Sequence, residues 1–247
     1  VSVYATGDIK GAGSIETGVA TVTDTALNAS SNPATTGSIT LKGAEISENG
    51  TLAFDVKIAT PVAAAGTGAA DVVLAPGTLT LESTGTTANT GDIVVTSANT
   101  LNVGTITFNN SAAQALTLTT TGNGSDLRLN GAITNGALVT ATVSASGNTT
   151  NDVVFNSSMT AKSWQIDATG NVTAVTGVTV ATADNANGDS GALNVGSSGT
   201  LIGGNLELQG TAKLLTGTAA KTDAAATSGA VSVYATGDIK GAGSIET

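Results

Sequence analysis

The stretch GDIVVTSANTLNVGTITFNN, residues 91–110, contains three short segments in which apolar and polar residues alternate. The alternating apolar pairs are Ile93/Val95, Leu101/Val103 and Ile106/Phe108. A two-residue period predicts β-strands with one buried face and one exposed face. The last two segments are separated only by Gly104 and Thr105, so we expect the chain to turn a corner at these small residues.

The same alternation recurs along the whole chain. Further apolar pairs are Val1/Val3, Ile39/Leu41, Leu52/Phe54/Val56/Ile58, Leu79/Leu81, Leu116/Leu118, Leu127/Leu129, Val153/Phe155, Trp164/Ile166, Leu193/Val195 and Leu206/Leu208. No stretch carries a capped apolar stripe of helical period, so we expect little helix. The Ala-rich run at residues 214–231 contains Thr and Gly, which favour a loop over a helix.

The residues between the segments distinguish among all-β folds. In LIGGNLELQG, residues 201–210, Gly203 and Gly204 again join two short segments. Hairpins would need longer strands placed symmetrically about such turns, whereas these segments have only about three to five residues. Glycine, and next Asn, adopts left-handed φ values at low cost, which suits corners. Asn residues at such places are Asn109, Asn110, Asn130, Asn135, Asn156 and Asn205.

Corners between short strands predict a parallel β-solenoid, in which successive strands lie on different faces and each coil pairs with the next. At about 20 to 25 residues per coil, 230 residues make about ten coils. Ordinary turns marked by Gly and Asn remain an alternative interpretation, and they would fit tandem β-sandwich modules.

A perfect internal repeat defines the organisation of the chain. The 17 residues VSVYATGDIKGAGSIET at 1–17 return unchanged at 231–247, which gives a period of 230 residues. We interpret residues 1–230 as one tandem-repeat unit and residues 231–247 as the start of the next, identical unit. The open end of a solenoid is an exposed strand edge that needs a cap, and the next repeat would supply it.

Composition excludes several classes of function. The chain has 18 acidic and 8 basic residues, a net charge of −10 and a single arginine, Arg128, so a nucleic-acid partner is not expected. Cysteine and histidine are absent, which removes disulfides, thiolate metal sites and the commonest general base. No apolar run is long enough for a membrane helix, and we expect any targeting segment to lie outside residues 1–247.

Few residues are candidates for a chemical site. The loop ADNANGDSG places Asp184 and Asp189 near amide side chains, which makes them the calcium candidates, although Ala183 stands where the EF-hand pattern needs its first carboxylate. Trp164 is the only tryptophan and could stack on a sugar, but its alternation with Ile166 favours a place in the core. The acidic residues are scattered, so we expect no catalytic residues, no cofactor and no enzyme activity.

Segments such as GDIVVTSANTLNVGTITFNN, GSDLRLNGAITNG and GALNVGSSGTLIGGNLELQG resemble the shafts of bacterial autotransporters and of secreted exoproteins of the filamentous-haemagglutinin type. The resemblance covers most of the chain, but it lies in the general pattern of short strands and glycines, and no signature peptide is present. It implies a right-handed parallel β-helix on a cell surface, in adhesion or matrix formation. The 230-residue period also resembles very long bacterial surface proteins, whose repeats are commonly β-sandwiches.

These observations together predict a structural protein that forms a long extracellular fibre or cell-surface shaft. Its partners would be neighbouring repeats, joined end to end, with lateral bundling or cell-surface glycans as further contacts. The alternatives are a surface-layer or β-sandwich adhesin array and, less favoured, a polysaccharide-active β-helix.

Overall fold

The computed structural model is all-β and describes residues 1–11, 14–16, 20–22, 34–35, 38–48, 51–53, 56–58, 74–75, 78–85, 91–109, 112–221 and 225–247. Within these ranges the only helical element is a short 3₁₀ turn, η1 (Gly136–Leu138). Every pairing between named strands is parallel. The predicted all-β class with parallel strands is confirmed.

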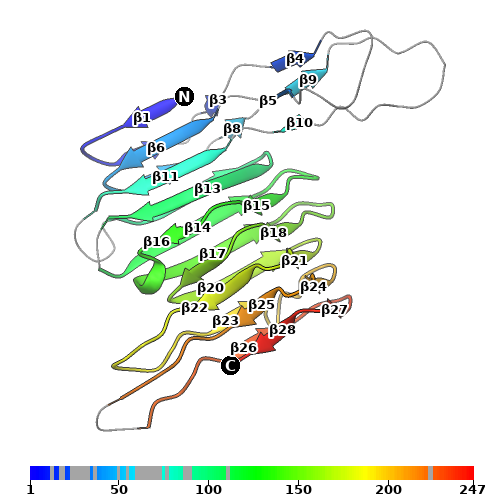
Figure 1. Cartoon of the computed structure of the whole chain (residues 1–247). Helices are drawn as coiled ribbons and strands as arrows, with labels where there is room; N and C mark the ends of the chain where they lie inside the picture. The colour runs from blue at the N-terminus through cyan, green and yellow to red at the C-terminus, as the bar shows by residue number, and fades with distance from the viewer. Residues whose placement is uncertain are drawn as a thin grey trace, which may run out of the picture.

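Three sheets hold most of the strands (Figure 1). The ten-stranded sheet runs in the order β1 (Ser2–Tyr4), β6 (Ile39–Gly43), β11 (Leu79–Ser83), β13 (Leu101–Phe108), β15 (Leu127–Leu129), β18 (Val153–Phe155), β21 (Val172–Ala174), β24 (Leu206–Leu208) and β27 (Ile239–Gly241), and β16 (Ile133–Thr134) also pairs with β13. The eight-stranded sheet runs in the order β2 (Ile9–Gly11), β7 (Ile46–Glu48), β12 (Ile93–Ser97), β14 (Gln114–Thr120), β17 (Val139–Ala145), β20 (Ser163–Ala168), β23 (Leu193–Val195) and β26 (Val231–Val233).

The remaining strands form smaller sheets. The four-stranded sheet contains β19 (Met159–Ala161), β22 (Thr179–Thr182), β25 (Lys213–Leu215) and β28 (Ser244–Glu246). Three two-stranded sheets pair β3 (Ser14–Glu16) with β8 (Thr51–Ala53), β4 (Ala20–Val22) with β9 (Val56–Ile58), and β10 (Leu74–Ala75) with β5 (Ala34–Thr35).

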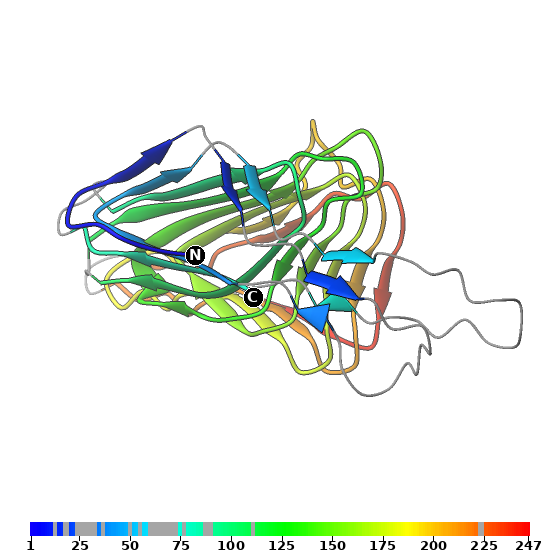
Figure 2. The same cartoon turned by 90° about the horizontal axis from the view of Figure 1, so that it is seen from above.

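The order of the strands along the chain is regular in the C-terminal half. From β17 onward the chain visits the eight-stranded, ten-stranded and four-stranded sheets in turn, and each visit adds a strand beside the previous strand of that sheet. Seen from above, the strands of successive visits lie over one another (Figure 2). Each strand therefore pairs with residues about 20 to 40 positions away, and neighbours along the chain rarely pair.

Alternation places the apolar side chains inside. Strands β6, β11 and β12 each show buried residues at every second position. Because the register is parallel, inward residues form columns; one column is Leu101, Leu127, Val153, Val172, Leu206 and Ile239. Full burial of such an aliphatic side chain contributes roughly 1.5–3 kcal/mol. The predicted apolar pairs whose side chains the structure describes lie in strands, except that Val1 precedes β1 and is exposed, and most of these residues are fully buried.

The predicted corner at Gly104 and Thr105 is wrong. Both residues lie within the single strand β13. The register against β11 shifts here, because Leu79 is opposite Val103 but Leu81 is opposite Ile106. One extra residue in β13 forms a β-bulge, which restores the inward phase of Ile106 without ending the strand.

The left-handed corners are also fewer than expected. Of the described Asn residues named above, only Asn135 has a positive φ, of 60°. Gly203 and Gly204 do lie at a bend, but neither has a positive φ. Glycine is needed there for another reason: a Cβ on Gly203 would collide with the carbonyl oxygen of Thr169 on the neighbouring strand level. Asn110 lies outside the described residues.

The alternating run predicted over residues 52–58 is two strands instead of one. β8 and β9 belong to different two-stranded sheets, and Phe54 lies outside the described residues.

The two identical 17-residue segments occupy different sheets. In the first copy, β1 lies in the ten-stranded sheet, β2 in the eight-stranded sheet and β3 beside β8. In the second copy, β26 lies in the eight-stranded sheet, β27 in the ten-stranded sheet and β28 in the four-stranded sheet. The three strands recur, but their partners differ, because a strand's partner is set by what lies next to it in space.

Candidate functional site

The loop that carries the calcium candidates is bonded to the segment that follows β25. Oδ1 of Asp184 accepts hydrogen bonds from the backbone N–H of Thr218 at 2.7 Å and from its hydroxyl at 2.9 Å. These bonds stabilise the carboxylate and lower the pKa of Asp184 below its usual range. The carboxylate therefore fastens one loop to the next.

Asp189 plays a similar part with other partners. Nζ of Lys221 lies 2.8 Å from Oδ1 of Asp189, and the backbone N–H of Thr227 donates to the same carboxylate at 2.9 Å. The lysine first, and then the Thr227 N–H, lower the pKa of Asp189. Because an ammonium group already contacts this carboxylate, a cation there would have to displace it.

The structure does not join Asp184 and Asp189 into a metal-binding cluster. No group of three or more His, Cys, Asp or Glu side chains that could hold a metal ion occurs among the described residues. The calcium hypothesis for this loop stays a prediction.

Trp164 is a core residue, as its alternation indicated. Its side chain is fully buried, and its indole N–H donates to the carbonyl of Ala181 at 2.8 Å. The ring of Phe155 meets it edge to face, with ring centroids 5.7 Å apart. A buried, hydrogen-bonded indole has no face left for a sugar.

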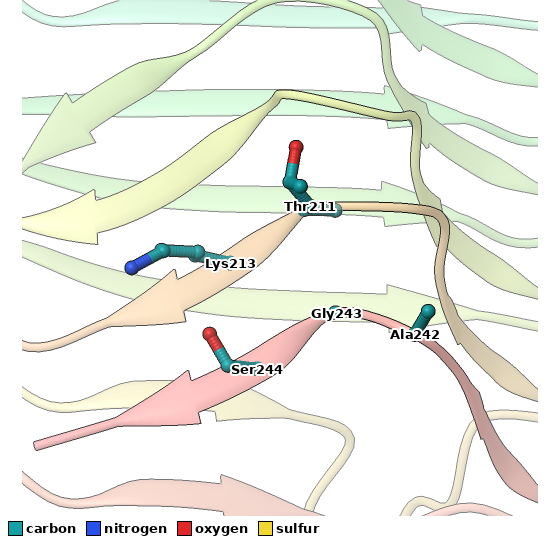
Figure 3. Close-up of a pocket in the computed structure, with 6 residues that line it drawn as sticks. Thr211, Lys213, Ala242, Gly243 and Ser244 are labelled. Atoms are coloured by element: carbon teal, nitrogen blue, oxygen red, sulfur yellow. The ribbon is translucent and has the colours of Figure 1, made fainter.

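The pocket drawn in Figure 3 lies between β25 and β28. It is a small depression of about 190 Å³ lined by Thr211, Ala212, Lys213, Ala242, Gly243 and Ser244. Its one ionisable group, Nζ of Lys213, pairs with Glu246 at 2.8 Å. The lining offers no pair of groups suited to acid–base or nucleophilic chemistry.

A ladder of Asp and Asn residues runs across the N-terminal ends of strands β15, β18, β21, β24 and β27 of the ten-stranded sheet. This ladder was not among the features predicted from the sequence. Each residue lies one position before a strand, and the side-chain oxygen of every member but the last accepts the backbone N–H of the next member. The members in order are Asp126, Asp152, Asn171, Asn205 and Asp238, with donor–acceptor distances of 2.6–3.0 Å. The signal was present in the sequence as an Asp or Asn directly before the strand in SDLRL, NDVVF, GNVTA, GNLEL and GDIKG.

The ends of the sheets carry the exposed apolar surface. Seven large apolar side chains are exposed among the described residues, and five of them belong to the two identical segments: Val1, Tyr4, Tyr234, Ile239 and Ile245. β1, β26, β27 and β28 are terminal strands of their sheets, so within the part of the chain that the structure describes each has a neighbouring strand on one side only. An unpaired edge beside exposed aliphatic residues is a surface suited to pairing with another chain.

Ion pairs also link successive strands. Lys42 pairs with Glu82 at 2.7 Å between β6 and β11, and Lys240 pairs with Glu207 at 2.9 Å between β27 and β24. Such exposed pairs contribute at most about 1 kcal/mol each, so they favour register more than stability.

Among the described residues, no helix has the length and the apolar character needed to cross a membrane. Comparison of the chain with protein-family models, with curated proteins and with solved structures found no match.

Proposed function

We propose that the protein is a structural repeat that forms a long extracellular fibre or cell-surface shaft by end-to-end stacking. One observation carries the proposal: every pairing between named strands is parallel and joins one strand level to the next, and the chain begins and ends with the same strand-forming sequence. In this proposal the strands wind as a β-solenoid, right-handed as in the exoprotein shafts that the sequence resembles. The longest sheet has eight strands, β1 to β24, before it reaches the second copy at β27, so a unit has about eight coils and not the predicted ten.

The physical mechanism would be additive. Each coil buries a thin aliphatic layer and satisfies its backbone N–H and C=O groups through the coils on either side. At about 4.8 Å per level, the eight levels of the longest sheet would advance one unit by about 38 Å. Stability then grows with the number of units, and stiffness follows from continuous hydrogen-bonded sheets.

The parallel pairing also bears on the alternatives. β-Sandwich modules are built from antiparallel sheets, whereas all pairings between named strands are parallel here. A polysaccharide-active β-helix needs grouped acids or bases in a cleft, and the described pocket has a single lysine.

Placement outside the cell is part of the same proposal. A chain without Cys, rich in Thr, Ser, Asn and Gly, and with a net charge of −10 suits a soluble polymer exposed to an oxidising medium. Adhesion or matrix formation would follow from the length of the shaft. Labelling of intact cells with an antibody to this unit tests the location, and staining only after cell lysis would contradict it.

Electron microscopy and fibre diffraction of a protein with several units test the fold and the function together. We expect a smooth rod whose length rises by about 38 Å per unit and a meridional reflection at about 4.8 Å. Beads of about 100 residues joined by linkers would contradict the proposal and favour a module array.

A further inference from the structure

We propose that the 17-residue sequence at residues 1–17 and 231–247, hereafter the linking segment, forms one shared layer between adjacent units. On one side it pairs with β23, β24 and β25 of the unit before, and on the other with β6, β7 and β8 of the unit after. This inference rests on the proposed end-to-end stacking and specifies the strand register of the joint.

The two copies show the two sides of this layer separately. The second copy pairs only with earlier strands: Ser232 is opposite Asn194, and Lys240 is opposite Glu207. The first copy pairs only with later strands: Ser2, which is equivalent to Ser232, is opposite Thr40. In a tandem array a single linking segment has both neighbours, so both registers apply to it at once.

The backbone hydrogen bonds of the two copies use different groups of the segment. The N–H of Tyr234 donates to the carbonyl of Val195 in the second copy, whereas in the first copy the next N–H along, that of Ala5, donates to the carbonyl of Lys42. A parallel strand between two neighbours alternates in this way, with successive residues bonding to opposite sides.

The same complementarity holds at the glycine of the segment. In the second copy, the N–H of Gly237 donates to the carbonyl of Gly204. In the first copy, the carbonyl of the equivalent Gly7 accepts the N–H of Ala44. One residue thus has a donor for the unit before and an acceptor for the unit after.

The following two residues repeat the division of roles. The carbonyl of Asp238 accepts the N–H of Leu206 from the preceding strand. The N–H of Ile9, which is equivalent to Ile239, donates to the carbonyl of Glu45 on the following strand. Each N–H and C=O group named in these bonds therefore bonds to only one of the two units.

The inward residues also match on both sides. Val233, or Val3 in the first copy, has Val195 before it and Leu41 after it. Ile239, or Ile9, has Leu206 before it and Ile46 after it. Aliphatic side chains therefore continue their columns through the joint.

Exposure indicates what the second copy lacks. Ile239 is 57% exposed at the free edge, whereas the equivalent Ile9 is partly buried against the core because a following strand covers it. Charge agrees with this arrangement: Lys240 pairs with Glu207 at 2.9 Å, and the equivalent Lys10 lies 3.6 Å from Glu45. One lysine in the joint would lie between a glutamate of each unit.

A two-unit chain tests the joint directly, with residues 1–230 placed before the full 247 residues. The native chain has no cysteine, so introduced pairs report without background. The preceding-side pair is Asn194→Cys of the first unit with Ser232→Cys. The following-side pair is Lys240→Cys of that same linking segment with Ser47→Cys of the second unit. Opposite residues on parallel strands lie within the Cα separation that a disulfide allows.

We expect mild oxidation to form both disulfides in one molecule, as detected by mass spectrometry of proteolytic fragments. The matched control joins Ser232→Cys with Ser47→Cys of the second unit, which lie on strands that do not pair with each other in the proposed joint and should stay reduced. A reduced following-side pair beside an oxidised preceding-side pair overturns the joint, because the segment would then follow only the unit before it.

Hydrogen exchange on the cysteine-free two-unit chain provides an independent measurement. We expect the amides equivalent to Tyr4 and Ile9 in the middle linking segment to be protected together, since one bonds backward and the other forward. Rapid exchange of the Ile9-equivalent amide overturns the joint. Imaging of the two-unit chain that carries both cysteine pairs separates the two proposals. A smooth rod without the following-side disulfide contradicts the joint alone, and both disulfides within beaded particles contradict the fibre alone.

Discussion

The backbone N–H of Asn171 donates to Oδ1 of Asp152 over 2.6 Å, from one strand level to the next. The position is the same in the five levels from β15 to β27: an Asp or Asn directly before a strand of the ten-stranded sheet. Asn171 lies one position before β21, outside the ladder of the strand itself, so its N–H needs an acceptor from a side chain. The side chain therefore extends the hydrogen-bonded sheet past the end of its strands.

We predict that Asp152→Ala lowers the free energy of unfolding by about 1–3 kcal/mol, because it removes the acceptor for the Asn171 N–H. Asp152→Asn retains an oxygen at the same position and should cost much less. Urea denaturation followed by circular dichroism measures both variants. An equal loss in the two variants would show that charge, and not the acceptor, matters at this position.

Gly203→Ala should destabilise the protein by about 1–3 kcal/mol, because the new methyl group collides with the carbonyl oxygen of Thr169. Gly199→Ala is the matched control, since a Cβ there meets nothing within 4 Å. Thermal unfolding compares the two. A Gly203→Ala protein as stable as the Gly199→Ala protein would refute the close approach of the two strand levels.

Trp164→Ala should lower the free energy of unfolding by about 3–5 kcal/mol through the cavity it leaves beside Phe155. Trp164→Phe fills much of that volume but leaves the Ala181 carbonyl without its indole donor, so an intermediate loss is expected. Circular dichroism in urea gives the values. A neutral Trp164→Ala would contradict the buried position and reopen a binding role.

The acidic loop should titrate at unusually low pH. Lys221 and the Thr227 N–H depress the pKa of Asp189, so the bonds to this carboxylate are intact above its ordinary pKa and are lost as the pH falls through the lower native value. Carbon-detected NMR of the carboxyl groups measures this. Lys221→Met should raise the pKa of Asp189 towards its ordinary value, while that of Asp184, held by Thr218, stays low. A rise in both would show that the loop had rearranged.

Periodicity predicted the inward residues well, because alternation depends only on which side of a strand faces the core. Leu127, Val153 and Leu206 are fully buried, as their spacing indicated. The corner at Gly104 was not predictable in the same way. A glycine between two alternating segments fits a turn and a bulge equally, and the choice is made by the strand beside it, β11.

The pairing partner of each strand was the other feature that could not be predicted from the sequence. Residues 1–17 and 231–247 have identical local preferences, yet they lie in different sheets. Only the neighbouring strands distinguish them, and these come from distant parts of the chain. The Asp and Asn ladder, by contrast, was readable, since an Asp or Asn precedes strand after strand at the same position.

The different sheets of the two copies have a geometric consequence for an assembled fibre. Through the proposed joint, the eight-stranded sheet of one unit runs on into the ten-stranded sheet of the next. Each unit is then turned about the long axis relative to its predecessor. Successive copies of a surface feature such as the Asp189 loop would follow a helical path around the fibre. A flat partner that contacts one side of the fibre would therefore meet this loop only at intervals.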